Sequence, residues 1–179
     1  MSQKEVEILF CTPKQWHLSS QIIKWTLGAK FSHVCLKINS EFYERVMVYE
    51  ASAGQVQAEN YDNWLKRNKV LSRFDVTVSS ERKKKMIQFC IDHLRYKYGF
   101  WSLIGIFFND KFGIRLPLGI DGDKKFICSE FTYLCLKDEI LEMARSKQIE
   151  IDKIEDYIDP TEVYKILASN APDKKLKLA

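Results

Sequence analysis

Residues 31–52, which read FSHVCLKINSEFYERVMVYEAS, decide the fold that this sequence predicts. His33 starts an apolar alternating run over 33–38, and residues 46–51 form a second apolar run of the kind found on strands. A polar turn at Asn39, Ser40 and Glu41 separates the two runs, which is typical of neighbouring antiparallel strands. The first strand would begin at His33, and the second would carry Glu50.

Outward from this pair, strands dominate the first half of the chain and helices the second. Further strands are expected over 5–11, 55–57 and 70–78, and helices over 15–27, 60–66, about 79–96, 100–108, 128–136 and 160–167. Residues 109–125 read as a long loop. Gly28 ends the first helix, whose expected core face consists of Trp16, Ile22, Ile23 and Leu27. The sequence therefore predicts an α+β fold, an antiparallel sheet with helices packed on it.

Composition indicates one globular domain over residues 1–179. The apolar share of 46% and aromatic share of 13% suffice for a core, which we place at about 5–168, with a basic tail at 169–179. The net charge of +4 is too small for a dedicated nucleic-acid binder. The basic run 82–85 is expected on the solvated face of a helix; a phosphate or membrane-headgroup contact is the alternative.

Several features favour a cytoplasmic setting. The first six residues contain no apolar signal core, and the longest apolar stretch, 99–108, is too short to span a bilayer. The five cysteines are an odd number in scattered positions, as expected for reduced thiols rather than a disulfide framework. These features do not exclude a phage- or virus-encoded origin.

The chemistry of the chain centres on Cys128, where an irregular basic stretch at 121–125 gives way to a helical pattern. A thiol at a helix N-terminus faces unpaired backbone N–H groups and the positive end of the helix dipole, and both favour thiolate. A histidine brought against that thiol, here His33, would complete an activated nucleophile. Glu50 would orient the imidazole. The chain order His33, Glu50, Cys128 thus suggests a cysteine hydrolase.

Each of these residues also has a structural interpretation. Cys128 would then be a small hydrophobe, His33 a core histidine and Glu50 a solvated edge-strand carboxylate. Cys35, two residues from His33 on one strand face, and Cys135 are expected in the core. A zinc site using His33 and Cys35 has no Cys-x-x-Cys or His-x-x-x-His spacing to support it, so no metal and no cofactor is expected.

The order of the motifs resembles that of a known superfamily. Phe31-Ser32-His33-Val34 is followed by Tyr49-Glu50-Ala51 and Gly54, and later by Tyr96-Lys97-Tyr98-Gly99, Ile127-Cys128-Ser129-Glu130 and Pro160-Thr161-Glu162-Val163. This order is similar to the circularly permuted branch of the NlpC-type papain-like cysteine hydrolases. The YiiX-like proteins and, more distantly, the lecithin:retinol acyltransferase group belong to that branch. The likeness spans roughly residues 6–167; residues 109–123 depart from it, and the resemblance leaves their role open.

The resemblance implies a permuted papain-like fold and a thioester acyl-enzyme mechanism. Cys128 would attack a carbonyl carbon, His33 would move the proton, and Glu50 would hold the imidazole, although the family tolerates different third residues. Tyr98, Ser32 and Ser129 are assigned a supporting part at the oxyanion or substrate cleft. The substrate would be a peptide or amide, or alternatively a lipid ester or amide, with peripheral membrane contact. A non-catalytic interaction module and the oligomeric state both stay open.

Overall fold

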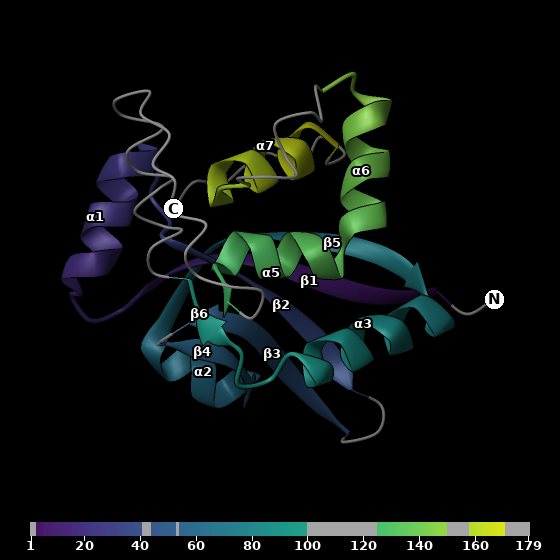
Figure 1. The fold of residues 1–179 in the computed structure, drawn as a ribbon, viewed down its shortest axis with the longest axis horizontal. Helices are drawn as coiled ribbons and strands as arrows, with labels where there is room; N and C mark the ends of the chain where they lie inside the picture. Colours follow the sequence, from purple (N-terminus) through teal and green to yellow (C-terminus); the bar gives the residue numbers. More distant parts are fainter. Residues whose placement is uncertain (1–2, 41–43, 53, 100–124, 150–157, 171–179) are drawn as a thin grey trace.

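The computed structural model describes residues 3–40, 44–52, 54–99, 125–149 and 158–170 (Figure 1). Its strands form one seven-stranded sheet in the order β5-β1-β2-β3-β4-β6-β7. Neighbouring strands are antiparallel except β6 and β7, which are parallel. The strands are β1 (Gln3–Pro13), β2 (His33–Ser40), β3 (Arg45–Ser52), β4 (Gln55–Asn60), β5 (Asn68–Ser79), β6 (Lys97–Tyr98) and β7 (Lys125–Phe126).

The helices lie on both faces of the sheet. They are α1 (Leu18–Leu27), α2 (Tyr61–Arg67), α3 (Ser80–Asp92), α5 (Cys128–Cys135), α6 (Lys137–Ser146) and α7 (Pro160–Asn170). Figure 1 shows α5 lying across the sheet, with α6 and α7 beyond it, α3 at one side and α1 at the far end. The predicted α+β architecture is therefore confirmed.

Strand alternation divides the buried side chains into two cores. The main core lies between the sheet and helices α3, α5, α6 and α7, and it includes the strand residues Ile8, Phe10, Leu36 and Tyr49. The smaller core lies under α2 and consists of Leu9, Cys11, Cys35, Val48 and Trp64. Successive strand residues point to opposite faces, so both cores draw on the same strands. A sheet that is buried on both faces can hold polar groups away from water.

Short polar side chains begin the helices where the sequence predicts it. The Ser79 hydroxyl accepts a hydrogen bond from the Arg82 N–H at 3.1 Å, and the Asp159 carboxylate accepts one from the Glu162 N–H at 3.0 Å. These contacts satisfy N–H groups that a helix leaves without partners. Gly28, with φ of 59°, ends α1. The predicted helix boundaries at 79–80, 159–160 and 28 are confirmed.

The expected core face of α1 is wrong in part. Trp16 is 71% exposed and Ile22 48% exposed, while Ile23 and Leu27 are partly buried. The buried residue of α1 is Ser20, whose hydroxyl bonds to those of Ser32 and Thr12. Periodicity locates an apolar stripe but does not say which side of a helix meets the protein.

The basic run 82–85 is also less solvated than expected. Arg82 makes a two-pronged ion pair with Glu139 of α6, at 2.7 and 2.8 Å, and Lys83 is only 6% exposed. Lys84 and Lys85 are exposed, as predicted. The bidentate pair ties α3 to α6.

Other differences concern element boundaries. Helix α3 ends at Asp92 rather than near residue 96, because the Arg95 N–H and the Tyr96 carbonyl bond to Val56 of β4. Strands β6 and β7 and helix α6 were not expected. The helix predicted at 100–108, most of the loop at 109–125 and most of the basic tail lie outside the described residues. None of the helices within the described ranges is long and apolar enough to cross a bilayer.

Candidate active site

The candidate site lies where the ends of several elements meet. His33 is the first residue of β2, Cys128 is the first residue of α5, and Glu50 lies near the end of β3. Helix α5 packs against β2 and β3, so its first residue comes to the strand ends. Side-chain interactions join His33 to both Glu50 and Cys128.

Glu50 is the most completely bonded side chain of the site. It is 3% exposed, and its Oε2 lies 2.8 Å from Nε2 of His33. The indole N–H of Trp64 donates to the same oxygen at 2.8 Å, and the Gln57 amide donates to Oε1 at 2.7 Å. A buried carboxylate is costly unless such partners compensate it. Glu50 is therefore a buried group held in one orientation, not a solvated edge-strand residue.

These contacts fix the charge of Glu50. Burial alone would raise the pKa of its carboxyl group, but the charge and hydrogen bond of His33 and the donors Gln57 and Trp64 lower that pKa to about 2. The group is a carboxylate at any pH near neutrality. It can orient an imidazole ring and stabilise a positive charge on it.

His33 lies between the carboxylate and the thiol. Burial by itself lowers the pKa of His33. Cys128 and Glu50, through their charges and their hydrogen bonds with the ring, outweigh burial and raise this pKa well above 6.5. Since Nε2 faces Glu50, Nδ1 is the ring nitrogen that remains for the thiol. An imidazolium at this place would favour the thiolate form of the neighbouring cysteine.

Cys128 lies at the start of α5, as predicted, and is 3% exposed. The helix begins with the Phe131 N–H bonded to the Ile127 carbonyl at 3.0 Å, and the Glu130 carboxylate accepts the Ile127 N–H at 3.4 Å. The N–H groups of the first helical turn, including that of Cys128, have no acceptor within the helix itself. They are suited to receive a developing negative charge on a substrate oxygen.

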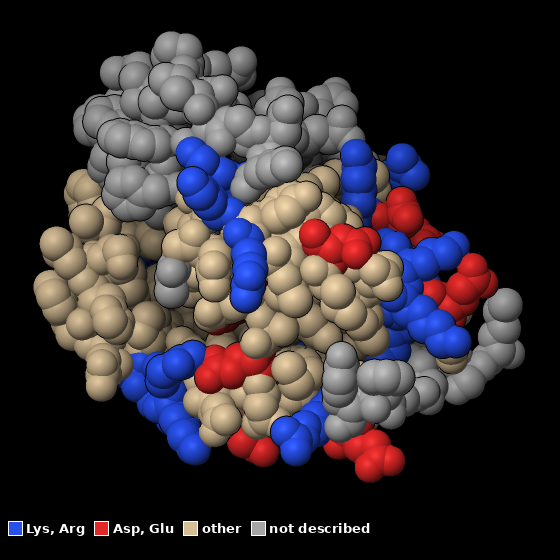
Figure 2. Space-filling model, turned by 60° about the horizontal axis from the view of Figure 1, so that its bottom comes forward, with Lys and Arg blue, Asp and Glu red and all other residues tan. Residues whose placement is uncertain are grey.

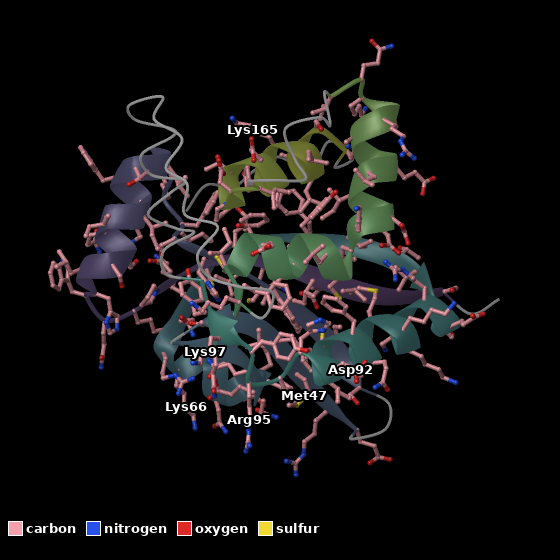
Figure 3. All side chains as sticks on the ribbon, viewed as in Figure 1. Met47, Lys66, Asp92, Arg95, Lys97 and Lys165 are labelled. Atoms are coloured by element: carbon pink, nitrogen blue, oxygen red, sulfur yellow. The ribbon has the colours of Figure 1, made fainter. Side chains whose placement is uncertain are left out.

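Tyr98 also faces this site. Neighbouring side chains on β6 differ: Lys97, labelled in Figure 3, is exposed, whereas Tyr98 is half-buried. Burial and the charge of Cys128 raise the pKa of the Tyr98 phenol, which places the two side chains in electrostatic contact. Tyr98 therefore keeps its proton and can donate a hydrogen bond.

Ser32 and Ser129, the two serines assigned to cleft support, bond within the protein. The Ser32 hydroxyl lies 2.7 Å from that of Ser20, which in turn lies 3.4 Å from the Thr12 hydroxyl. This chain ties α1 to the ends of β1 and β2. The Ser129 hydroxyl donates to the Ile158 carbonyl at 2.6 Å and holds α5 to the segment before α7. Both contacts hold in place the elements that carry His33 and Cys128.

Sequence reasoning missed Gln57, Trp64 and Cys11. Gln57 stands opposite Glu50 in the β3–β4 ladder, in which Ser52 pairs with Gln55. Trp64 comes from α2 on the far face of the sheet, for which the sequence holds no signal. Cys11 stands opposite His33 across the β1–β2 ladder, but α1 separates these strands in the sequence and hides the register.

A second group of thiols adjoins His33. Cys11 and Cys35 are fully buried, and their sulfur atoms and a His33 ring nitrogen lie within 4.8 Å of one another. Burial and a hydrogen bond with Cys11 raise the pKa of Cys35 well above its ordinary range. The expected core position of Cys35 is confirmed. Its place beside His33 is an addition to that expectation.

The surface around the site differs from one side to the other. Figure 2 shows Lys, Arg, Asp and Glu side chains interspersed over the right and lower parts of one face, while the left part, where α1 lies, is mostly uncharged. Helix α1 and the residues before it present exposed apolar side chains there, namely Trp16, Leu18, Ile22 and Trp25.

No protein-family model and no curated protein matches this sequence.

Proposed function

We propose that this protein is a cysteine hydrolase that cleaves an amide or peptide bond through Cys128, His33 and Glu50. One observation supports this proposal above the others. A buried glutamate, held by two further donors, is bonded to one nitrogen of a histidine that also interacts with a thiol at a helix N-terminus. A nucleophile, a base and an orienting group in that relation match the logic of a catalytic triad.

The reaction would proceed in two halves. The Cys128 thiolate attacks the carbonyl carbon of the substrate, and the Cys128 N–H and the Tyr98 hydroxyl bind the resulting oxyanion. The imidazolium of His33 protonates the leaving amine as the carbon–nitrogen bond breaks and a thioester forms. His33 then takes a proton from water, which attacks the thioester, releases the acid and restores the thiolate beside an imidazolium. Glu50 stays ionised and stabilises the imidazolium throughout.

The order of these residues along the chain agrees with the family resemblance. In the permuted NlpC-type branch the histidine strand comes first, and the cysteine helix comes late. Here β2 carries His33, β3 carries Glu50 and α5 carries Cys128. Their positions fit a permuted papain-like arrangement. Because all three residues are present in that order, we favour a hydrolase over a non-catalytic interaction module.

A lipid ester or amide is the second candidate substrate, and α1 favours it. Trp25 and Leu18 are 67% and 61% exposed, and residues 14–30 contain three lysines and no Asp or Glu. Tryptophan prefers the interface between lipid and water, and lysines add attraction to anionic headgroups. Helix α1 would then place the site at an anionic membrane surface, where an acyl chain would be presented to Cys128.

Acylating probes with amide and ester leaving groups test the proposal directly. After brief exposure near neutral pH, mass spectrometry should locate the adduct on Cys128, and the His33→Ala variant should give far less adduct. Cys135, in the same helix but two turns away, should stay unmodified in the folded protein. Equal modification of several cysteines, or none at Cys128, would refute the proposal.

The two substrate classes separate in a second measurement. If the substrate is a lipid, kcat/KM for acyl esters should rise over several added carbons, since each buried methylene contributes about 0.8 kcal/mol. The protein should also bind phosphatidylserine vesicles, and Trp16→Ala with Trp25→Ala should weaken that binding without changing the turnover of a soluble substrate. A flat response to chain length and no vesicle binding would leave the peptide substrate.

A further inference from the structure

The sulfur atoms of Cys11 and Cys35 and the ring of His33 form a cluster that hydrolysis does not need. The register explains why they meet: Cys11 stands opposite His33, and Cys35 follows two residues later on the same strand face. Hydrolysis uses only His33 of the three. The pair Cys90 and Cys135, with sulfurs 3.8 Å apart, is buried elsewhere and has no such histidine among its hydrogen-bond partners in the described residues.

We propose that Cys11, His33 and Cys35 form a binding site for Zn²⁺, and that zinc bound there switches the hydrolase off. The second half of this statement rests on the proposed function; the first does not. Zinc takes thiolate and imidazole ligands in tetrahedral geometry. Its bond lengths place ligand atoms roughly 3.8 Å apart, and the three atoms already lie within 4.8 Å of one another. Only small side-chain movements are needed.

The surroundings of His33 match those of a metal ligand. A zinc-binding histidine commonly donates its second N–H to a carboxylate, which fixes the ring and its tautomer. Glu50 already accepts from Nε2 of His33 at 2.8 Å, which leaves Nδ1 for the metal. Both oxygens of Glu50 have other partners, Trp64 and Gln57. The donor set is therefore sulfur and nitrogen without oxygen, which selects zinc over magnesium or calcium.

A disulfide between Cys11 and Cys35 is the less favourable use of the same sulfurs. The two residues are diagonal neighbours in the ladder, because Cys35 itself stands opposite Leu9. Diagonal pairs have Cα atoms about 7–8 Å apart, beyond the usual reach of a disulfide without backbone movement. A metal ion bridges that gap through two bonds of about 2.3 Å each.

Zinc and catalysis compete for one imidazole. When Zn²⁺ binds, the two thiols and the Nδ1–H of the His33 imidazolium release their protons to solvent, and Nδ1 then gives its lone pair to the metal. That nitrogen can then neither accept nor donate a proton toward Cys128. His33 is 13% exposed on its side chain, so the site opens to solvent at the histidine.

Cobalt(II) and zinc titrations of the metal-free protein test this inference. One equivalent of Co²⁺ should give thiolate-to-cobalt charge-transfer absorption and tetrahedral ligand-field bands, and Zn²⁺ should displace it. Cys11→Ala and Cys35→Ala should each lose most of the signal, whereas Cys90→Ala, at an equally buried thiol, should keep it. X-ray absorption of the zinc-loaded native chain should find two sulfur atoms and a nitrogen atom bound to the zinc ion. This measurement does not depend on the folding of any variant. Absence of sulfur neighbours around the bound zinc would overturn the proposed site. Metal binding that is unchanged in both Cys11→Ala and Cys35→Ala would also overturn it.

Labelling of Cys128 by iodoacetamide separates the two proposals. In the native chain, Zn²⁺ should slow this labelling at least about tenfold, and in Cys35→Ala the protection should disappear while labelling itself persists. Protection that survives in Cys35→Ala would mean that zinc binds His33 and Cys128 directly, and would overturn the inference. Cobalt binding to Cys11 and Cys35 without preferential labelling of Cys128 would refute the hydrolase and leave the metal site intact.

Discussion

Two groups of buried cysteines include the two ends of α5, Cys128 at its start and Cys135 at its end. The helix-layer pair, Cys90 and Cys135, joins α3 to α5, with sulfurs 3.8 Å apart. The strand-end group, Cys11, Cys35 and Cys128, surrounds His33. All five thiols are at most 3% exposed. Burial therefore does not distinguish the two groups of cysteines. The residues next to their sulfur atoms do.

The difference lies in what can accept a proton or a metal. The Cys90 sulfur contacts another thiol, and burial with that contact raises the pKa of Cys90 well above its ordinary value. The strand-end group instead adjoins an imidazole that is bonded to a carboxylate. We infer that the helix-layer pair serves packing and that the strand-end group serves chemistry. Matched substitutions in the two regions put this contrast to the test.

The largest expected effect is that of Cys128→Ser. Loss of the nucleophile should lower kcat by at least about a thousandfold, measured with the substrate that the acylating probes identify. Cys135→Ser, seven residues along the same helix, is the matched control and should keep most of the activity. Activity that survives in Cys128→Ser would show that both cysteines are packing residues.

His33→Gln should follow, with turnover reduced about 10²- to 10⁴-fold through loss of the general base. Iodoacetamide labelling of Cys128 at about pH 6 to 7 should slow as well, because no imidazolium then stabilises the thiolate. His93→Gln provides the control, since Nδ1 of His93 lies 2.7 Å from the Phe89 carbonyl within the α3 region. If both variants label at the native rate, His33 is a structural residue.

Glu50→Gln should destabilise the fold by roughly 3 kcal/mol, because it leaves His33 without its buried counter-charge. The pH dependence has a defined sign. Glu50, with its pKa lowered to about 2, stabilises the fold above 4.5 and loses that contribution as pH falls through about 2. His33, with its raised pKa, contributes fully below 6.5 and loses that contribution as pH rises through its folded pKa.

The difference in unfolding free energy between native and Glu50→Gln protein, from urea titrations, should therefore be largest between about pH 5 and 6.5 and should shrink on either side. The His33 pKa, followed by NMR, should fall in the variant. A difference that is the same at every pH would mean that Glu50 acts by packing alone.

The smallest expected effect belongs to Trp64→Phe. It removes the indole N–H that donates to Glu50 and keeps most of the buried ring, so it should cost about 1–3 kcal/mol. The exposed Trp25 of α1, changed to Phe, should cost almost nothing in the same thermal or urea measurement. If the two substitutions had equal effects on stability, Trp64 would not be one of the groups that position Glu50.

Local sequence predicted those parts of the fold that depend on neighbouring residues. The strands that carry His33 and Glu50, the caps at Ser79 and Asp159 and the helix start at Cys128 all follow from periodicity and capping chemistry. These rules involve residues a few positions apart. Helix α6 and strands β6 and β7 were missed because short elements take their stability from packing and pairing with distant segments.

The outward apolar side of α1 shows where such reasoning ends. The apolar residues Trp16, Ile22, Ile23 and Leu27 predicted a core face, but the structure exposes Trp16 and Ile22 and only partly buries Ile23 and Leu27. An amphipathic pattern is the same whether its apolar side meets a core or a partner. Only the placement of Ser20 against Ser32 and Thr12 decides which side of α1 meets the sheet.

For the site, the sequence by itself determined which residues could react, because the types His, Glu and Cys and their local settings limit the chemistry. Only the tertiary structure decided which of these residues lie next to one another. It placed Trp64 and Gln57 on the carboxylate and brought Cys11 across from His33. Sheet register and helix packing set these contacts, and also bring Cys128 to His33 from 95 positions along the chain. Hydrogen bonds and burial act through distance in space, which the order of residues along the chain does not record.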